Sequence, residues 1–133
     1  MADLTVTEAN VDWISGPKST ADAAETITAG DWLYQVTSTT VGVASNSDAA
    51  KDTVIGVALN AGTAGHPVTY AKDGAVVSWG AILTVGIFYV LSATGATSAT
   101  ADSATSDYVS LVGYSDTTSN MMLKIVNTGR QQG

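Results

Sequence analysis

Short runs of β-branched and aromatic residues alternate along the chain with Gly, Asn, Asp and Ser from Thr26 onward. Runs of this kind are typical of strands, and many of them at short spacing indicate an all-β sandwich or barrel. We therefore expect an all-β fold, a compact small β-barrel domain. The expected strands are Trp32–Thr37, Thr40–Ala44, Val54–Leu59, Val68–Ala71, Ala75–Trp79, Phe88–Ser92, Tyr108–Tyr114 and Met121–Val126.

The clearest local signal is the pair Asp73-Gly74, which separates the strand-forming runs Val68–Ala71 and Ala75–Trp79. Glycine accepts the positive φ that a tight turn between antiparallel strands requires. The sequence therefore predicts a β-hairpin over these two runs.

Residues 1–25 have a different pattern from the rest of the chain. Leu4 and Val6 alternate with polar neighbours, and the run Val11–Ile14 precedes the turn signal Ser15-Gly16-Pro17. We expect an extended N-terminal arm with one or two short strand-like pieces. The stretch Ala21–Glu25 could form one helical turn, although it is too short to be stable alone.

The remaining boundaries follow from composition. Residues 26–128 form the expected β domain, and the small residues between Ser92 and Ser106 indicate a long loop. Residues 129–133 contain no apolar anchor, so a flexible tail is expected there.

A weak internal repeat is visible when Ala29–Val36 is laid over Val85–Ser92. Each segment follows a Thr, and the second landmark, Val54–Val57, then matches Leu111–Tyr114. A duplication would give a pseudo-symmetric barrel or a pair of interlocked small sheets. The alternative is that glycine merely punctuates a β protein at regular intervals.

Composition narrows the possible functions. The chain has 133 residues, enough for one domain, with 45% hydrophobic and only 13% charged residues, which argues against intrinsic disorder. Its net charge of −7 disfavours nucleic acids and acidic membranes as partners, because both are bound largely through Lys and Arg. The absence of cysteine excludes disulfides and thiolate metal sites. We expect neither a signal peptide nor a membrane-spanning segment.

No pattern in the sequence points to catalysis, so we expect the chain not to be an enzyme and to need no cofactor or metal. His66, the single histidine, lies in a turn context and has no nucleophile motif near it. The aspartates lie mostly in turns, where a carboxylate caps backbone amides. The aspartates that could in principle pair as catalytic carboxylates are Asp31, Asp48, Asp52, Asp73, Asp102, Asp107 and Asp116.

The three tryptophans could form a sugar-stacking platform, but such residues more often fill a core or an interface. We expect Trp32 and Trp79 in the core and Trp13 at a partner. The low charge and many small side chains also favour association, since interface centres are depleted of charge. An oligomer, or a subunit bound to a larger lattice, fits better than a free monomer.

Four phrases of the sequence resemble the small capsid decoration, or cement, proteins of tailed phages. They are AGDWLY at 29–34, IGVAL at 55–59, YVLSATG at 89–95 and DYVSLVGYS at 107–115. The resemblance covers about residues 26–128 and rests on the order of short β phrases. It includes no motif in the arm.

The resemblance implies a tulip-like or barrel-like β domain, made in the host cytoplasm and placed on the outer surface of the virion capsid. It implies a homotrimer that clamps adjacent major capsid subunits, with an N-terminal arm that adds a strand to the capsid. By position alone, the capsid-contact residues would be Leu4, Val6, Val11, Trp13 and Ile14. The alternative function is a head-fibre or receptor-binding and glycan-binding adhesin module of the virion.

Overall fold

The computed structural model describes residues 6–45, 51–91, 97–99 and 108–131, and almost all of the regular secondary structure in them is β-strand. The expected all-β class is therefore confirmed. One 3-10 helix, Glu8–Asn10, precedes the strands. The strands are β1 (Asp12–Ser15), β2 (Lys18–Ala23), β3 (Trp32–Gln35), β4 (Thr40–Val43), β5 (Gly56–Ala58), β6 (Pro67–Ala71), β7 (Val76–Ser78), β8 (Phe88–Leu91), β9 (Thr97–Ala99), β10 (Tyr108–Ser115) and β11 (Asn120–Gln131).

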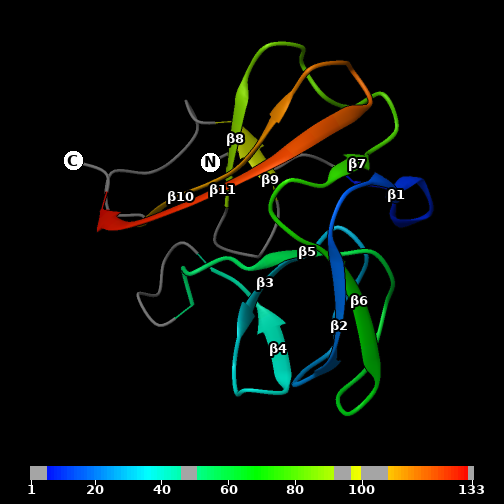
Figure 1. The fold of residues 1–133 in the computed structure, drawn as a ribbon, viewed down its shortest axis with the longest axis vertical. Helices are drawn as coiled ribbons and strands as arrows, with labels where there is room; N and C mark the ends of the chain where they lie inside the picture. Colours follow the sequence, from blue (N-terminus) through cyan, green and yellow to red (C-terminus); the bar gives the residue numbers. More distant parts are fainter. Residues whose placement is uncertain (1–5, 46–50, 92–96, 100–107, 132–133) are drawn as a thin grey trace.

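The strands form two layers. Strands β2-β4-β3-β5-β6 close into a barrel, and a six-stranded sheet has the order β1-β7-β11-β10-β8-β9. Figure 1 shows the barrel in the lower half of the view and strands β7, β8, β10 and β11 in the upper half. One apolar cluster fills the barrel, around Leu33, Val41 and Val68. A larger cluster lies between the layers, where Trp32 and Val57 of the barrel meet residues of the sheet such as Leu123.

The two layers are built from the same arrangement of strands. Opened between β2 and β4, the barrel has the order β2-β6-β5-β3-β4, and the sheet without β1 has the order β7-β11-β10-β8-β9. Each barrel strand corresponds to the sheet strand whose number is five higher, so that β2 matches β7 and β3 matches β8. We call β2–β6 the first unit and β7–β11 the second unit.

The registers of the strand pairs correspond as well. Leu33 pairs with Gly56 in the first unit, and Tyr89 pairs with Gly113 in the second. On the other side of the same strands, Leu33 pairs with Val43, and Tyr89 pairs with Ala99.

Backbone hydrogen bonds repeat in the same way. Gly30 N–H donates to Ala58 O at 2.9 Å, and Gly86 N–H donates to Ser115 O at 2.8 Å. Both glycines have positive φ, +95° and +85°. The interpretation of the sequence repeat as a structural duplication is therefore confirmed, in the alignment that the sequence indicated.

The two units differ in how their edges end. In the first unit β2 pairs with β4 in parallel, and this pair closes the barrel. In the second unit β7 pairs with β1 instead, and β9 is left at the opposite edge of the sheet. The second unit is therefore an open sheet.

The predicted hairpin over 68–79 is wrong, although the turn itself is present. Ala75 N–H donates to Lys72 O at 3.0 Å across Gly74, whose φ is +93°. The two flanking strands do not pair with each other, because β6 pairs with β2 and β5 whereas β7 pairs with β1 and β11. The turn is instead the crossing from the first unit to the second.

Within the expected arm at 1–25, the described residues 6–25 are joined to the β domain by strand pairing. β1 is a strand of the six-stranded sheet and β2 closes the barrel, so this segment contributes to both layers. Residues 21–23 continue β2, which replaces the helical turn expected over Ala21–Glu25. The chain ends differently from expectation too, since β11 extends to Gln131 through most of the expected tail at 129–133.

All eight strands expected from Trp32 to Val126 are present, with ends that differ by a few residues. Within the stretch expected to be a loop, Thr97–Ala99 forms β9 and pairs with β8. The rest of that stretch lies outside the described residues.

Candidate functional site

The predicted capsid-contact residues differ in how accessible they are. Val11 is 7% exposed and belongs to the core between the layers, and Val6 packs against the same core. Ile14 on β1 is 48% exposed. Leu4 lies outside the described residues. Of the predicted set in the described segments, Ile14 has the largest exposed fraction.

Trp13 is half-buried, and its neighbours hold the ring in place. The ring packs against the core between the layers, and its Nε1 donates to Gly16 O at 3.1 Å. Lys18 Nζ lies 4.1 Å from the ring centroid, a distance suited to a cation–π contact. Trp13 thus joins β1 to the turn that follows it and to the start of β2.

Trp32 and Trp79 are core residues, as expected. Both are fully buried, and their rings stack with centroids 6.0 Å apart and an interplanar angle of 27°. Trp32 Nε1 donates to Thr97 Oγ1 at 2.7 Å, whereas Trp79 Nε1 has no hydrogen-bond partner among the described residues. Neither ring can form a sugar-stacking platform, because neither reaches the surface.

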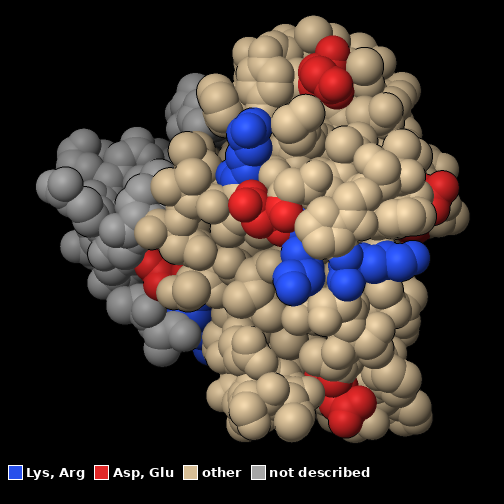
Figure 2. Space-filling model, in the orientation of Figure 1, with Lys and Arg blue, Asp and Glu red and all other residues tan. Residues whose placement is uncertain are grey.

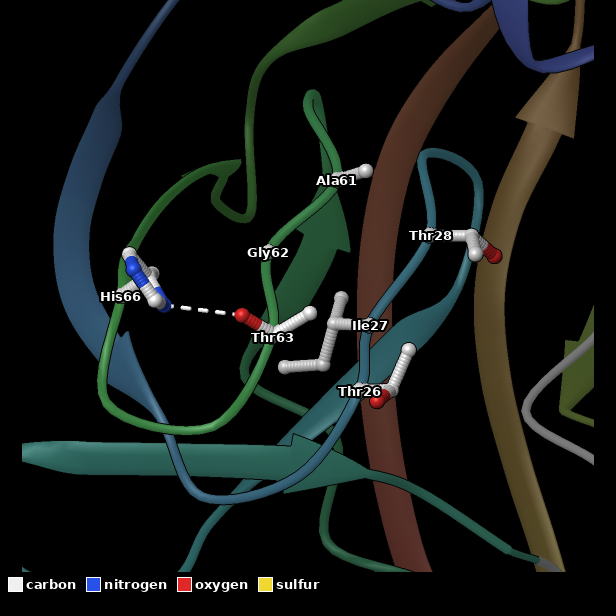
Figure 3. A pocket seen from close by; sticks show the side chains of 7 residues that line it. All are labelled: Thr26, Ile27, Thr28, Ala61, Gly62, Thr63 and His66. Carbon is white, nitrogen blue, oxygen red and sulfur yellow. Dashed lines mark hydrogen bonds between the residues drawn. The ribbon is translucent and has the colours of Figure 1, made fainter.

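A shallow groove of about 370 Å³ lies where the segment before β3 runs beside the β5–β6 connection. Ile27 and Gly62 join these two segments through an isolated β-bridge. Figure 3 shows His66 on one side of the groove and Thr28 on the other. The groove is lined by Thr26, Ile27, Thr28, Ala61, Gly62, Thr63 and His66.

His66 is held in a local turn. Its Nδ1 lies 2.8 Å from Thr63 Oγ1, and its backbone N–H donates to Thr63 O at 3.0 Å. The turn itself brings the Thr63 hydroxyl, three residues away, within reach of the imidazole. None of the residues that line the groove is an Asp or Glu that could orient the imidazole for catalysis. Within the described segments, no group of three or more His, Asp or Glu residues is placed to hold a metal ion.

Two of the aspartates have the capping role expected of them. Asp31 Oδ2 accepts hydrogen bonds from Thr28 N at 3.0 Å and from Thr28 Oγ1 at 3.1 Å. Burial raises the pKa of Asp31 above its usual value of 3.8, against the effect of those two hydrogen bonds. Asp73 Oδ1 accepts from Ile125 N at 2.7 Å, which ties the crossing turn to β11.

A row of apolar side chains crosses the outer face of the second unit, and no pattern in the sequence indicated it. Phe88, 44% exposed, pairs with Tyr114, and their rings lie 5.0 Å apart with a 54° tilt. Tyr114 pairs with Met122, and Met122 pairs with Val76, so the row crosses four strands. Val126, 50% exposed, lies further along β11.

Charged side chains are few on the surface of the molecule that Figure 2 shows. In Figure 2 most of the visible surface carries neither sign of charge, and the Lys, Arg, Asp and Glu side chains are scattered over it. No helix in the described part of the chain is long and apolar enough to cross a membrane.

Comparisons with known proteins do not assign this chain to a family. No family model matches the sequence, and no curated protein matches it at a significant level.

Proposed function

We propose that this chain is a structural virion protein that binds the outer surface of a phage head. There it stabilises the capsid lattice by clamping adjacent major capsid subunits.

The observation that carries the proposal is where the four phrases of the resemblance fall in the fold. AGDWLY covers most of β3, IGVAL contains β5, YVLSATG begins in β8, and DYVSLVGYS contains β10. β3 pairs with β5 and β8 pairs with β10, so the phrases form the equivalent central pair of each unit. The similarity to decoration proteins therefore concerns the residues that define the duplicated fold.

The physical requirements of such a protein are modest. Many weakly bound copies on a repeating lattice dissociate slowly as a set. Binding only to the assembled head also stabilises that state by mass action. An uncharged, rigid β surface is sufficient for both effects, and no active site is required.

β1 is the element best suited to contact the capsid. It is an edge strand of the six-stranded sheet, and edge strands accept a further strand through their backbone groups. Ile14 adds an exposed apolar side chain to that edge. In this proposal the capsid is contacted by β1, an edge strand that is paired with β7, and not by a free N-terminal arm.

The first test is the copy number of this chain relative to the major capsid protein, measured by quantitative mass spectrometry of purified virions. We expect a ratio approaching one. A handful of copies per particle would favour the head-fibre or adhesin alternative, and absence from the virion would exclude both functions.

The second test uses purified heads and two matched variants. Ile14→Lys is expected to weaken head binding at least tenfold, because a charge would enter the apolar contact. Val36→Lys is the control, since Val36 is similarly exposed at 42% but lies at the end of β3 in the barrel. Equal binding by both variants and the unmodified chain would remove β1 from the contact.

The adhesin alternative could use the groove near His66. Its hydroxyls and imidazole could bond a sugar, but its lining contains no Trp, Tyr or Phe ring on which a sugar could stack. Glycan-array binding that is lost on His66→Ala would favour the adhesin over the decoration protein.

A further inference from the structure

The outer face of the second unit consists of the paired row Val76, Met122, Tyr114 and Phe88, together with Val126. Phe88 and Val126 are about half exposed, and the other three are partly buried. An apolar surface that is continuous over four strands differs from single exposed apolar residues, which are common on any protein.

Because the fold is duplicated, the outer-face residues of the second unit have counterparts in the first unit, and the burial of the two sets can be compared. There the row Phe88, Tyr114 and Met122 corresponds to Trp32, Val57 and Ala71, because Trp32 pairs with Val57 and Val57 pairs with Ala71. All three of these barrel residues are fully buried in the core between the layers.

The first unit therefore uses this row to pack against an apolar sheet, namely the inner face of the second unit. That contact includes the stack of Trp32 on Trp79 and the hydrogen bond from Trp32 to Thr97. The second unit presents the corresponding row to the outside. The same face of the repeated unit is thus an internal interface in one copy and an open surface in the other.

We propose that the outer face of the second unit is an interface with a second copy of this chain. In the first unit the equivalent row already packs onto an apolar sheet within the molecule, so the open row of the second unit is suited to the same kind of contact with another molecule. The inner face is already covered in every copy, so a second copy would meet this row with its own outer face. A second copy supplies an apolar sheet of matching size and composition.

The charges beside the row are also compatible with a second copy. Lys124 and Asp73 both line a groove of about 300 Å³ that runs along β11 at the crossing turn. A second copy brings one group of each sign to this border, so opposite charges can meet across the interface. Such pairs fix the register of an interface more than they raise its affinity.

This inference does not depend on the proposed virion function, because it concerns association of the purified chain in solution. The proposed capsid contact uses β1, and the interface between copies uses the outer face. Head binding and self-association can therefore fail separately.

The test is the molar mass of the full chain in solution, measured by sedimentation velocity between about 1 and 100 μM, a range that covers weak to moderate association. We expect the unmodified chain to form a defined assembly of two or more copies. Phe88→Lys should shift it toward the monomer with at least tenfold weaker association, and Val36→Lys should leave it unchanged.

Two further variants separate loss of the interface from loss of the fold. Val126→Lys alters the same face at a half-exposed position and should also weaken association. Lys124→Glu should weaken it as well, because it would place two like charges beside each other at the border of both copies. Thermal unfolding of each variant should remain cooperative and near that of the unmodified chain.

A monomeric unmodified chain at the highest concentration would overturn the proposal. An assembly that Phe88→Lys and Val126→Lys leave intact would overturn it equally. A monomer that binds heads through the outer face would assign this face to the capsid protein instead.

Discussion

Gly56 and Gly113 occupy the same position in the two units, and at each of them a neighbouring strand passes too close for a side chain. A Cβ on Gly56 would overlap the Ala71 carbonyl oxygen and lie 2.7 Å from Tyr70 Cδ2. A Cβ on Gly113 would overlap the end of the Met121 side chain and lie 3.0 Å from Met122 O. Ala71 corresponds to Met122, and Tyr70 to Met121, in the two strand pairings.

The two glycines should nevertheless differ in their tolerance of alanine. Gly56→Ala is expected to lower the free energy of unfolding by at least about 2 kcal/mol, because backbone in a closed barrel must move. Gly113→Ala should cost only about 1 kcal/mol, since a flexible methionine can change its rotamer. Urea unfolding of both variants measures the difference. Equal losses would show that the barrel adjusts as easily as the open sheet.

The carboxyl group of Asp31 should make stability depend on pH. Its pKa is raised in the fold, first by burial and then by the nearby charges of Glu8 and Glu25. Its contribution to stability is therefore fully present below pH 3.8 and is lost as the pH rises through the raised value.

Asp31→Asn is expected to remove this dependence, because an amide oxygen can still accept the bonds from Thr28 and carries no charge. The variant should gain stability relative to the unmodified chain between acidic and neutral pH. Thermal unfolding across that range measures the gain. A constant difference between the two proteins at all pH values would contradict the assignment.

The hydrogen bond from Trp32 Nε1 to Thr97 Oγ1 joins the two layers inside the core. Thr97→Val would leave the indole N–H buried without a partner, which costs about 1–3 kcal/mol of unfolding free energy. Thr20→Val is the control, because Thr20 has an exposed hydroxyl contact with Thr69. Its effect should stay within about 0.5 kcal/mol in the same denaturant titration.

Val11 and Ile14 test whether the N-terminal segment belongs to the core. Val11→Ala should lower the free energy of unfolding by about 1–2 kcal/mol through lost burial. Ile14→Ala should change it by less than about 0.5 kcal/mol, because the side chain is half exposed. If the two variants proved equally stable, the segment would be a loosely attached arm after all.

Much of the fold could be predicted from the sequence, because strand formation in this chain has a strong local signal. The β-branched runs, the turn at Gly74 and the register of the repeat all depend on residues close together in sequence. β9 carried no such signal, since Thr97–Ala99 contains only small residues. It is a strand because β8 offers three paired positions and because Thr97 bonds Trp32.

The choice of strand partners could not be predicted in the same way. The turn at Asp73 and Gly74 suits a hairpin, yet β6 and β7 find better partners far along the chain. For the same reason β1 and β2 resembled an arm, because the strands that pair with them come later. The outer face could not be predicted, because alternation of apolar and polar residues shows that a strand has two faces but does not show which face is covered by the rest of the protein.

The early position of β1 and β2 in the chain also has a consequence for how the protein folds. β2 pairs with β4 and β6, so it gains both neighbours only once Ala71 has been made, and β1 pairs with β7, so it gains its neighbour only once Ser78 has been made. Pairings that are distant in sequence slow folding, because the intervening chain must be ordered before the contact forms. The barrel should therefore close only after β6 has been made, and β1 must remain unpaired on a growing chain until β7, the first strand of the second unit, is available.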